Sequence, residues 1–145
     1  MLKNSIKVAS IIAVVLAVPG WRLLADQTAA PAAKPAGAAP TVTRTVLNQQ
    51  DLPIPGYAVA MVRVDLPVGA REGRHQHPGT LVAHVVEGTL TLDYEGKPTM
   101  QYKVGDTFYV EPGKIHEGQN KGTVPVKLIA SFVFPKDKPM TIQVP

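Results

Sequence analysis

The sequence contains no cysteine, and only 6% of its 145 residues are aromatic. The absence of cysteine excludes disulfide bridges, zinc ribbons, iron–sulfur clusters and a cysteine nucleophile. Because aromatic side chains are scarce, a core must consist mainly of Val, Ile, Leu and Ala, of which Val and Ile favour β-strands. A chain of this length predicts one ordinary domain with attached segments, and two full domains are excluded.

The formal net charge is +4, but most of this excess lies near the N-terminus. Lys3, Lys7 and Arg22 fall within the first 25 residues, which contain no acidic residue. The remaining 12 basic residues stand against 11 acidic ones, so the rest of the chain carries a net charge of +1. It lacks the clusters of Lys and Arg interleaved with aromatic residues that bind phosphate backbones. The sequence therefore predicts no nucleic-acid partner.

Residues 1–25 have the pattern of a secretory signal peptide. A basic start is followed by the apolar stretch Val8–Val18 and then by a break at Pro19 and Gly20. This stretch has 11 residues, and a membrane-spanning helix needs roughly 20, which favours a signal peptide. An uncleaved membrane anchor and an ordinary helix are the alternatives. We expect a periplasmic or secreted protein, attached to a membrane only if this segment is not cleaved.

Residues 26–43 are rich in Ala and Pro and have few large side chains to bury, so they predict a disordered linker. Residues 44–145 predict one all-β domain, because short apolar runs alternate there with Gly, Pro and Asp at turns. The expected strands are Tyr57–Leu66, Leu81–Val86, Thr89–Tyr94, Thr107–Val110, Val126–Phe134 and Met140–Val144. This spacing is typical of a sandwich or barrel.

Two of the four histidines, His75 and His77, stand two residues apart. In an extended segment their side chains point to the same face, because side chains alternate along a strand. A transition metal needs at least one more ligand, and His116 follows a separate expected strand and a turn that can return it to this pair. The three histidines are therefore candidate metal ligands, with scattered surface histidines as the alternative.

Order and spacing around these histidines resemble the two motifs of the cupin superfamily. In the first, G-x5-H-x-H-x3,4-E-x6-G, the matching residues are Gly69, His75, His77 and Gly88. In the second, G-x5-P-x-G-x2-H-x3-N, the matching residues are Gly105, Gly113, His116 and Asn120, with Glu111 in place of the proline. The resemblance implies a single-domain jelly-roll β-barrel. It also implies that His75, His77 and His116 hold a divalent transition metal, whether iron, copper, manganese or zinc.

Leu81 stands where most metal-binding cupins have a glutamate ligand. The resemblance then implies a neutral three-histidine face, which leaves a bound dication more net positive charge and open positions for water, dioxygen or a chelating substrate. Some cupin dioxygenases are similar in using three histidines on iron. The alternative is weaker metal binding, which leaves a ligand-binding or structural barrel.

Parity along the expected strands assigns faces to the neighbouring residues. If Leu81 faces inward, so do Ala83 and Val85, whereas His84 faces outward. Glu111 either supports His116 or faces solvent. Candidates for the pocket wall, with core packing as the alternative, are Phe108, Val110, Phe132 and Phe134. Candidates for attracting an anionic substrate, with plain exposure as the alternative, are Arg71 and Arg74.

Two interpretations of function follow. The first is an exported metal-dependent enzyme, a dioxygenase acting on a small organic substrate. The second is a non-catalytic barrel that binds a small ligand or a metal. A homodimer formed through the outer strands is compatible with both. Motifs typical of hydrolases and P-loop proteins are lacking from the sequence.

Overall fold

The computed structural model describes residues 40–145. The predicted signal peptide, residues 1–25, and residues 26–39 of the predicted linker lie outside the described residues. Within the described part the chain forms strands, turns and loops without a helix, so no helix there could cross a membrane. The prediction of an all-β fold is confirmed.

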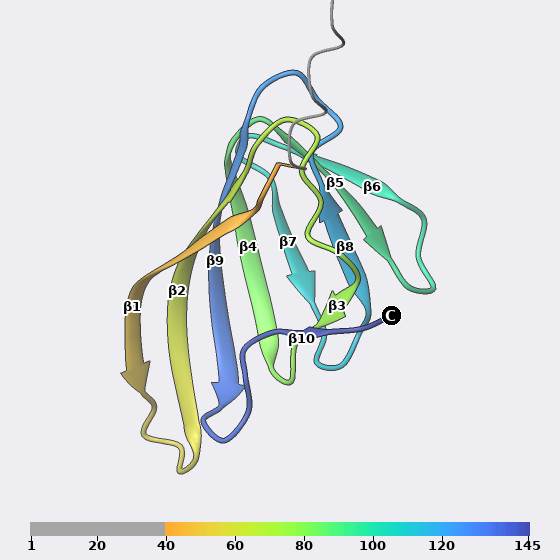
Figure 1. Ribbon diagram of the computed structural model, residues 1–145. Coiled ribbons are helices and arrows are strands. Elements are labelled where there is room, and N and C mark those ends of the chain that lie inside the picture. Colours follow the sequence, from red (N-terminus) through yellow and green to blue (C-terminus); the bar gives the residue numbers. More distant parts are fainter. Residues whose placement is uncertain (1–39) are drawn as a thin grey trace, which may run out of the picture. The chain divides into compact units, whose positions relative to one another are not determined.

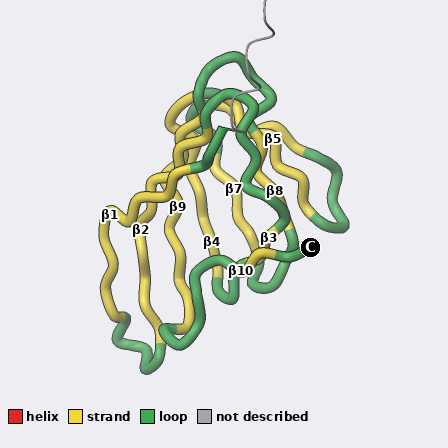
Figure 2. Tube along the Cα trace, viewed as in Figure 1, coloured by secondary structure: helices red, strands yellow, loops and turns green. Residues whose placement is uncertain are grey.

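Two antiparallel five-stranded sheets make up this part of the chain (Figure 1). The larger sheet has the order β1-β2-β9-β4-β7, and the smaller sheet has the order β10-β3-β8-β5-β6. The strands are β1 (Thr43–Asp51), β2 (Tyr57–Leu66), β3 (His75–Gln76), β4 (Thr80–Glu87), β5 (Thr89–Tyr94), β6 (Met100–Lys103), β7 (Thr107–Val110), β8 (His116–Gln119), β9 (Val126–Pro135) and β10 (Ile142–Gln143). Loops join strands of the two sheets at both ends, as Figure 2 shows, in the manner of a jelly roll.

Alternating burial along the long strands builds the core between the sheets. In β2 and β9 the even-numbered residues are buried, and the residues between them are partly or fully exposed. In β4 the buried residues are Leu81, Ala83 and Val85, as parity predicts. Since successive side chains point to opposite faces, the register of β4 between β7 and β9 fixes which residues face the interior.

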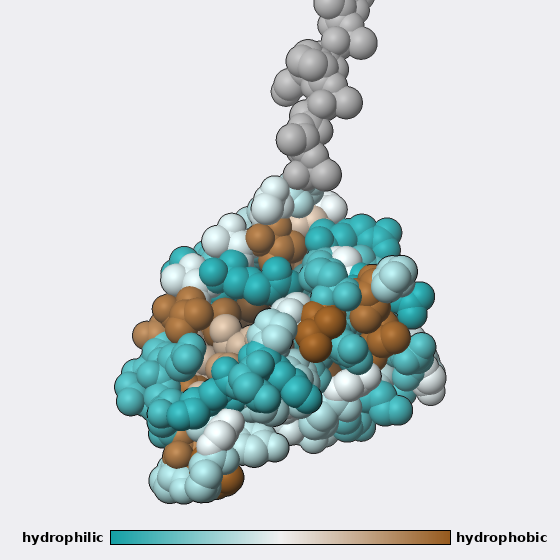
Figure 3. Space-filling model, turned by 60° about the horizontal axis from the view of Figure 1, so that its bottom comes forward, coloured by the Kyte–Doolittle hydropathy of each residue, from teal (hydrophilic) through white to brown (hydrophobic). Residues whose placement is uncertain are grey.

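The outer face of the larger sheet also carries apolar side chains. Met61, Val82 and Tyr109 are 44%, 47% and 49% exposed. The register places these residues and Ser131 in one row across β2, β9, β4 and β7. Figure 3 shows one face of the molecule, on which apolar patches lie between hydrophilic residues.

Two of the edge strands, β1 and β6, show no alternation of buried and exposed residues. All nine residues of β1 are exposed, and β6 has three exposed residues and one that is half-buried. Both lie at a sheet edge, where a strand has a neighbour on one side only. Neither face of β1 is buried, and β6 is buried only in part, so their residues show no alternating pattern and hydrophobic periodicity did not predict them.

Gly88 is the point where the chain leaves the larger sheet at the end of β4 and enters the smaller sheet at β5. Its φ is +75°, a backbone conformation that residues other than glycine rarely adopt. A Cβ atom placed there would also overlap the carbonyl oxygen of Pro125. Gly96, in the turn after β5, has a φ of +77° and open space around it.

We expect Gly88→Ala to destabilise the domain much more than Gly96→Ala. Both substitutions force alanine into the left-handed region, at about 1 kcal/mol each, whereas only Gly88→Ala adds a backbone clash. The clash should bring its total loss to about 3 kcal/mol or more. Urea unfolding of both variants measures the difference, and equal losses would contradict the steric role of Gly88.

Candidate metal centre

Three histidines from two segments of the chain converge inside the barrel. His75 begins β3, His77 follows its end, and His116 begins β8, where it pairs directly with His75 in the antiparallel register. Their ring centroids lie 4.3 to 5.0 Å apart, and one ring nitrogen from each lies within 4.8 Å of the other two. All three side chains are buried. The structure thus brings together the three candidate ligands, and their role in holding a metal stays a prediction.

Each imidazole is oriented by a backbone carbonyl. Nδ1 of His75 lies 2.8 Å from the oxygen of Gly73, that of His77 lies 2.7 Å from Met140, and that of His116 lies 3.0 Å from Lys114. A carbonyl oxygen only accepts, so Nδ1 carries the proton and donates it in all three rings. In the neutral ring Nε2 is then unprotonated, which is the tautomer that a metal ligand requires.

Burial keeps these rings neutral. Loss of solvent lowers the pKa of His77 to about 3, and its hydrogen bond to Met140 opposes this only in part. Burial is also the main cause of the lowered pKa of His75 and of the lowered pKa of His116, where the neighbouring charge of His75 adds to it. Neutral imidazoles donate electron pairs to a metal without first losing a proton, so metal binding need not compete with protonation near neutral pH.

The cavity beside the histidines is narrow and mostly apolar. The space open to the centre of a water molecule is about 20 Å³, and its walls include Leu81, Phe108 and Phe132. Phe132 packs edge-on against His77, with ring centroids 5.0 Å apart. A volume of this size holds little more than one water molecule. The expectation that Phe108 and Phe132 form part of the pocket wall is confirmed, whereas Val110 and Phe134 pack in the core.

An ion pair that the sequence did not predict lines the same cavity. Glu72 precedes β3, and its carboxylate oxygen Oε1 accepts a hydrogen bond from Nη2 of Arg44 on β1 at 2.6 Å. The Glu72 side chain is only 10% exposed, and burial raises the pKa of its carboxyl group, while Arg44 acts against this rise. Glu72 lies three residues before His75, but this spacing did not identify it as a cavity residue. The strand β3 is too short for alternation to show on which face of the sheet Glu72 lies.

Other residues singled out from the sequence lie away from the cavity. His84 is exposed on the outer face of β4, as parity predicts. Glu111 forms an ion pair with Lys97 and does not contact His116, which is supported by the carbonyl of Lys114 instead. Arg74 is exposed and lies 3.9 Å from Glu95.

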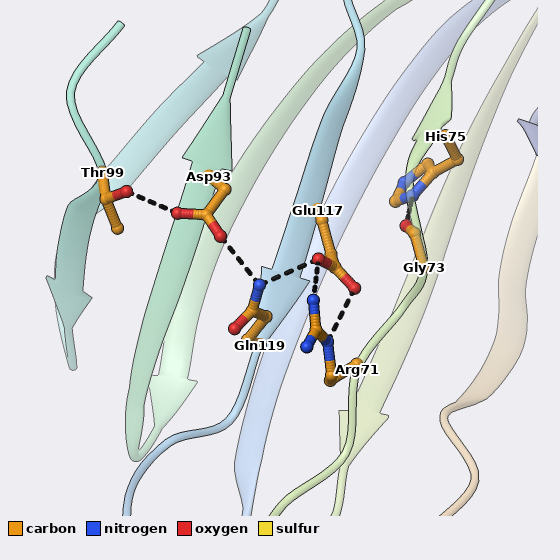
Figure 4. Close-up of polar contacts among 7 residues, drawn as sticks. All are labelled: Arg71, Gly73, His75, Asp93, Thr99, Glu117 and Gln119. Carbon is orange, nitrogen blue, oxygen red and sulfur yellow. Dashed lines mark hydrogen bonds and ion pairs between the residues drawn. The ribbon is translucent and has the colours of Figure 1, made fainter. Parts of the chain in front are cut away.

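Arg71 belongs to a polar network on the outer side of the smaller sheet (Figure 4). Its Nε and Nη2 donate to the two carboxylate oxygens of Glu117 at 3.0 and 2.6 Å. Gln119 donates to Glu117 and to Asp93, and Thr99 donates to Asp93. The pairing with Arg71 lowers the pKa of Glu117. Arg71 is thus paired with Glu117 on this side of the sheet, although its own side chain is 64% exposed.

Comparisons with known proteins agree with this architecture. A family model described as a cupin domain matches residues 62–132. A double-stranded β-helix protein from Klebsiella pneumoniae superimposes with a TM-score of 0.59 at 21% identity, over 77% of this chain and 90% of that one. The chain belongs to the cupin superfamily. The resemblance inferred from the two histidine motifs is confirmed.

Among individual relatives of this cupin, germin-like protein 1-1 of Oryza sativa subsp. japonica is 31% identical over 94 residues. These residues make up 61% of this chain and 44% of the rice protein. The structure of an oxalate oxidase in complex with the substrate analogue glycolate has a TM-score of 0.59 and 25% identity, covering 75% of this chain and 59% of that one. The cupin thus spans about half the length of the germin-like proteins that it matches.

Acid should destabilise the metal-free cupin through its buried histidines. With a pKa of about 3 in the folded state and 6.5 when solvent-exposed, His77 binds more protons in the unfolded chain between these values. The free energy of unfolding should therefore fall with decreasing pH below 6.5, by up to about 1.4 kcal/mol per pH unit for this one group. His77→Gln should reduce this slope, and His84→Gln, on the outer face, should not. Urea titrations from pH 7 to 4 in the presence of a chelator measure both slopes, and an unchanged slope in His77→Gln would contradict the argument.

Proposed function

We propose that this cupin is a metal-dependent oxygenase, which holds a divalent transition metal through Nε2 of His75, His77 and His116 and oxidises a small organic substrate. The observation that carries the proposal is the common orientation of the three rings. Each Nδ1–H is tied to a backbone carbonyl, so three unprotonated nitrogens are available at one buried point. Imidazole nitrogen suits iron, copper and zinc.

The residues of the chain define what such a centre can do. Three neutral imidazoles add no negative charge, and Leu81 supplies no ligand from β4. A bound redox metal would then supply open coordination positions and electron transfer for dioxygen chemistry. Leu81, Phe108 and Phe132 give the cavity apolar walls, and the low polarity of such walls strengthens electrostatic interactions inside.

A second candidate function is a module that binds a metal or a small ligand without catalysis. The small volume of the cavity, about 20 Å³, favours it, because a substrate larger than a few atoms enters only if side chains move. The two functions share the three-histidine site and differ in turnover.

Metal content and dioxygen consumption test the proposal together. Protein purified without chelator or metal-affinity resin should contain close to one equivalent of iron, copper or manganese, and His75→Ala and His116→Ala should lose it. Elemental analysis measures the content, and His84→Ala is the matched control outside the cavity. An oxygen electrode then screens small organic compounds, and turnover should disappear in the two variants that lose the metal.

The outcomes separate the two candidate functions. Bound metal without oxygen consumption, or zinc as the metal found, would favour the binding module. Protein that takes up no metal even after incubation with iron, copper, manganese and zinc salts would overturn the three-histidine site itself.

We further propose that the barrel acts outside the cytoplasm as a homodimer. The basic and apolar start of the sequence supports export, which the N-terminal residue of the mature protein tests. The row formed by Met61, Ser131, Val82 and Tyr109 supports pairing of two copies through the larger sheet, because a two-fold axis brings such a row onto itself.

Light scattering tests the dimer. The wild-type protein should have twice the mass of the chain, and Val82→Asp should halve it, since a charge would be buried at the centre of the interface. Val104→Asp, which changes an exposed residue outside the row, should leave the mass unchanged. A monomeric wild type would contradict the proposal.

A further inference from the structure

One buried carboxylate near the histidines has no part in the three-histidine group. Glu72 lines the same cavity as His75, His77 and His116, and its side chain is 10% exposed. It is the only carboxylate among the residues that line this cavity. Its position differs from that of the glutamate in the cupin motif, which lies on β4.

The backbone of β8 makes room for this carboxylate. Gly118 lies two residues after His116 on the same strand, so both positions face the interior. A Cβ atom at position 118 would overlap Oε2 of Glu72. The glycine therefore leaves the space that the carboxylate occupies, beside the position from which His116 enters the cavity.

The carboxylate of Glu72 has one side-chain partner, Arg44, and a hydrogen bond to the backbone of Gly118 beside it. Arg44 donates one hydrogen bond, from Nη2 to Oε1, and its side chain is one-third exposed on the edge strand β1. Arg71, in contrast, makes two hydrogen bonds to Glu117, and Gln119 adds a third. The Arg44–Glu72 pair thus has less geometric constraint than the Arg71–Glu117 pair, although its carboxylate lies inside the barrel.

A dication among three neutral imidazoles keeps its full charge in a medium of low dielectric constant, where a nearby negative charge has a large effect. We propose that Glu72 is the negatively charged group that partly balances the charge of the metal, an inference that rests on the metal site proposed above. It supplies from the segment before β3 the negative charge that Leu81 does not supply from β4. Arg44 holds the carboxylate in the cavity, at the expense of some of its attraction for the metal.

The affinity for Zn²⁺, which has no redox chemistry, tests this role without reference to turnover. Isothermal titration with the full chain should show that Glu72→Gln weakens binding by about 10- to 100-fold, as loss of a supporting carboxylate does at other metal sites. Arg44→Gln should tighten binding several-fold, because it removes a positive charge and the partner that competes for Glu72. Glu111→Gln is the matched control, since Glu111 is 40% exposed and paired with Lys97 outside the cavity, and the affinity of this variant should equal that of the wild type.

A rescue variant separates charge from folding. In Glu72→Gln/Leu81→Glu the carboxylate returns to the cavity from β4, and Zn²⁺ binding should recover. A double variant that binds no better than Glu72→Gln would show that the loss was not one of negative charge, and would overturn the proposal. Thermal unfolding of the metal-free proteins identifies any variant that fails to fold.

Further outcomes separate this inference from the proposed function. If the wild type binds Zn²⁺ and Glu72→Gln binds it equally well, the three-histidine site stands and the role of Glu72 falls. If Glu72→Gln and Arg44→Gln weaken binding alike, the pair is only a structural link between β1 and the segment before β3. A wild type that binds no Zn²⁺ overturns both proposals.

Discussion

The histidine cluster depends on one short pairing, that of β3 with β8, in which His75 lies directly opposite His116. Two residues of β3 make too few contacts to hold this register alone. The C-terminal segment completes it, because Ile142 and Gln143 of β10 pair with the other edge of β3. The carbonyl of Met140 in the same segment orients His77. The last residues of the chain therefore support two of the three candidate ligands.

Burial of the three imidazoles explains why this support is needed. A buried polar group without a hydrogen bond costs about 1–3 kcal/mol, and each Nδ1–H here has a carbonyl partner. The same hydrogen bonds fix the tautomer, so one set of contacts serves both stability and ligand orientation. Burial also lowers the pKa values of the three rings, because a charged imidazole would lose its hydration in the apolar cavity.

The sequence predicted those features that arise from local periodicity and spacing. The bounds of β2, β5 and β7 match the expected strands, because buried and exposed residues alternate there or apolar residues run together. The two motifs predicted which histidines meet. The edge strands β1 and β6 were not predicted, because exposed strands carry no apolar pattern.

The contacts that complete the site could not be predicted, since they join segments far apart in the chain. Arg44 reaches Glu72 across 28 residues, and Met140 reaches His77 across 63. A backbone carbonyl leaves no trace in residue type, so the support of His77 has no sequence signal at all. Glu111, for which the sequence left open a role beside His116 or exposure to solvent, pairs with Lys97.

Leu81 stands where the cupin motif has a glutamate, and this difference affects more than the number of metal ligands. Leu81 continues the apolar lining of Ala83 and Val85 along β4, so the larger sheet presents a dry wall to the histidines. The charges that remain, Arg44 and Glu72, enter from β1 and from the segment before β3. Arg44 lies partly in solvent, whereas the histidines are buried. An ion or substrate that binds Arg44 from solvent therefore changes the electrostatic potential at the buried histidines. The edge strand, which contributes no buried residue to the core, contributes Arg44, the one cationic side chain among the described residues that line this cavity.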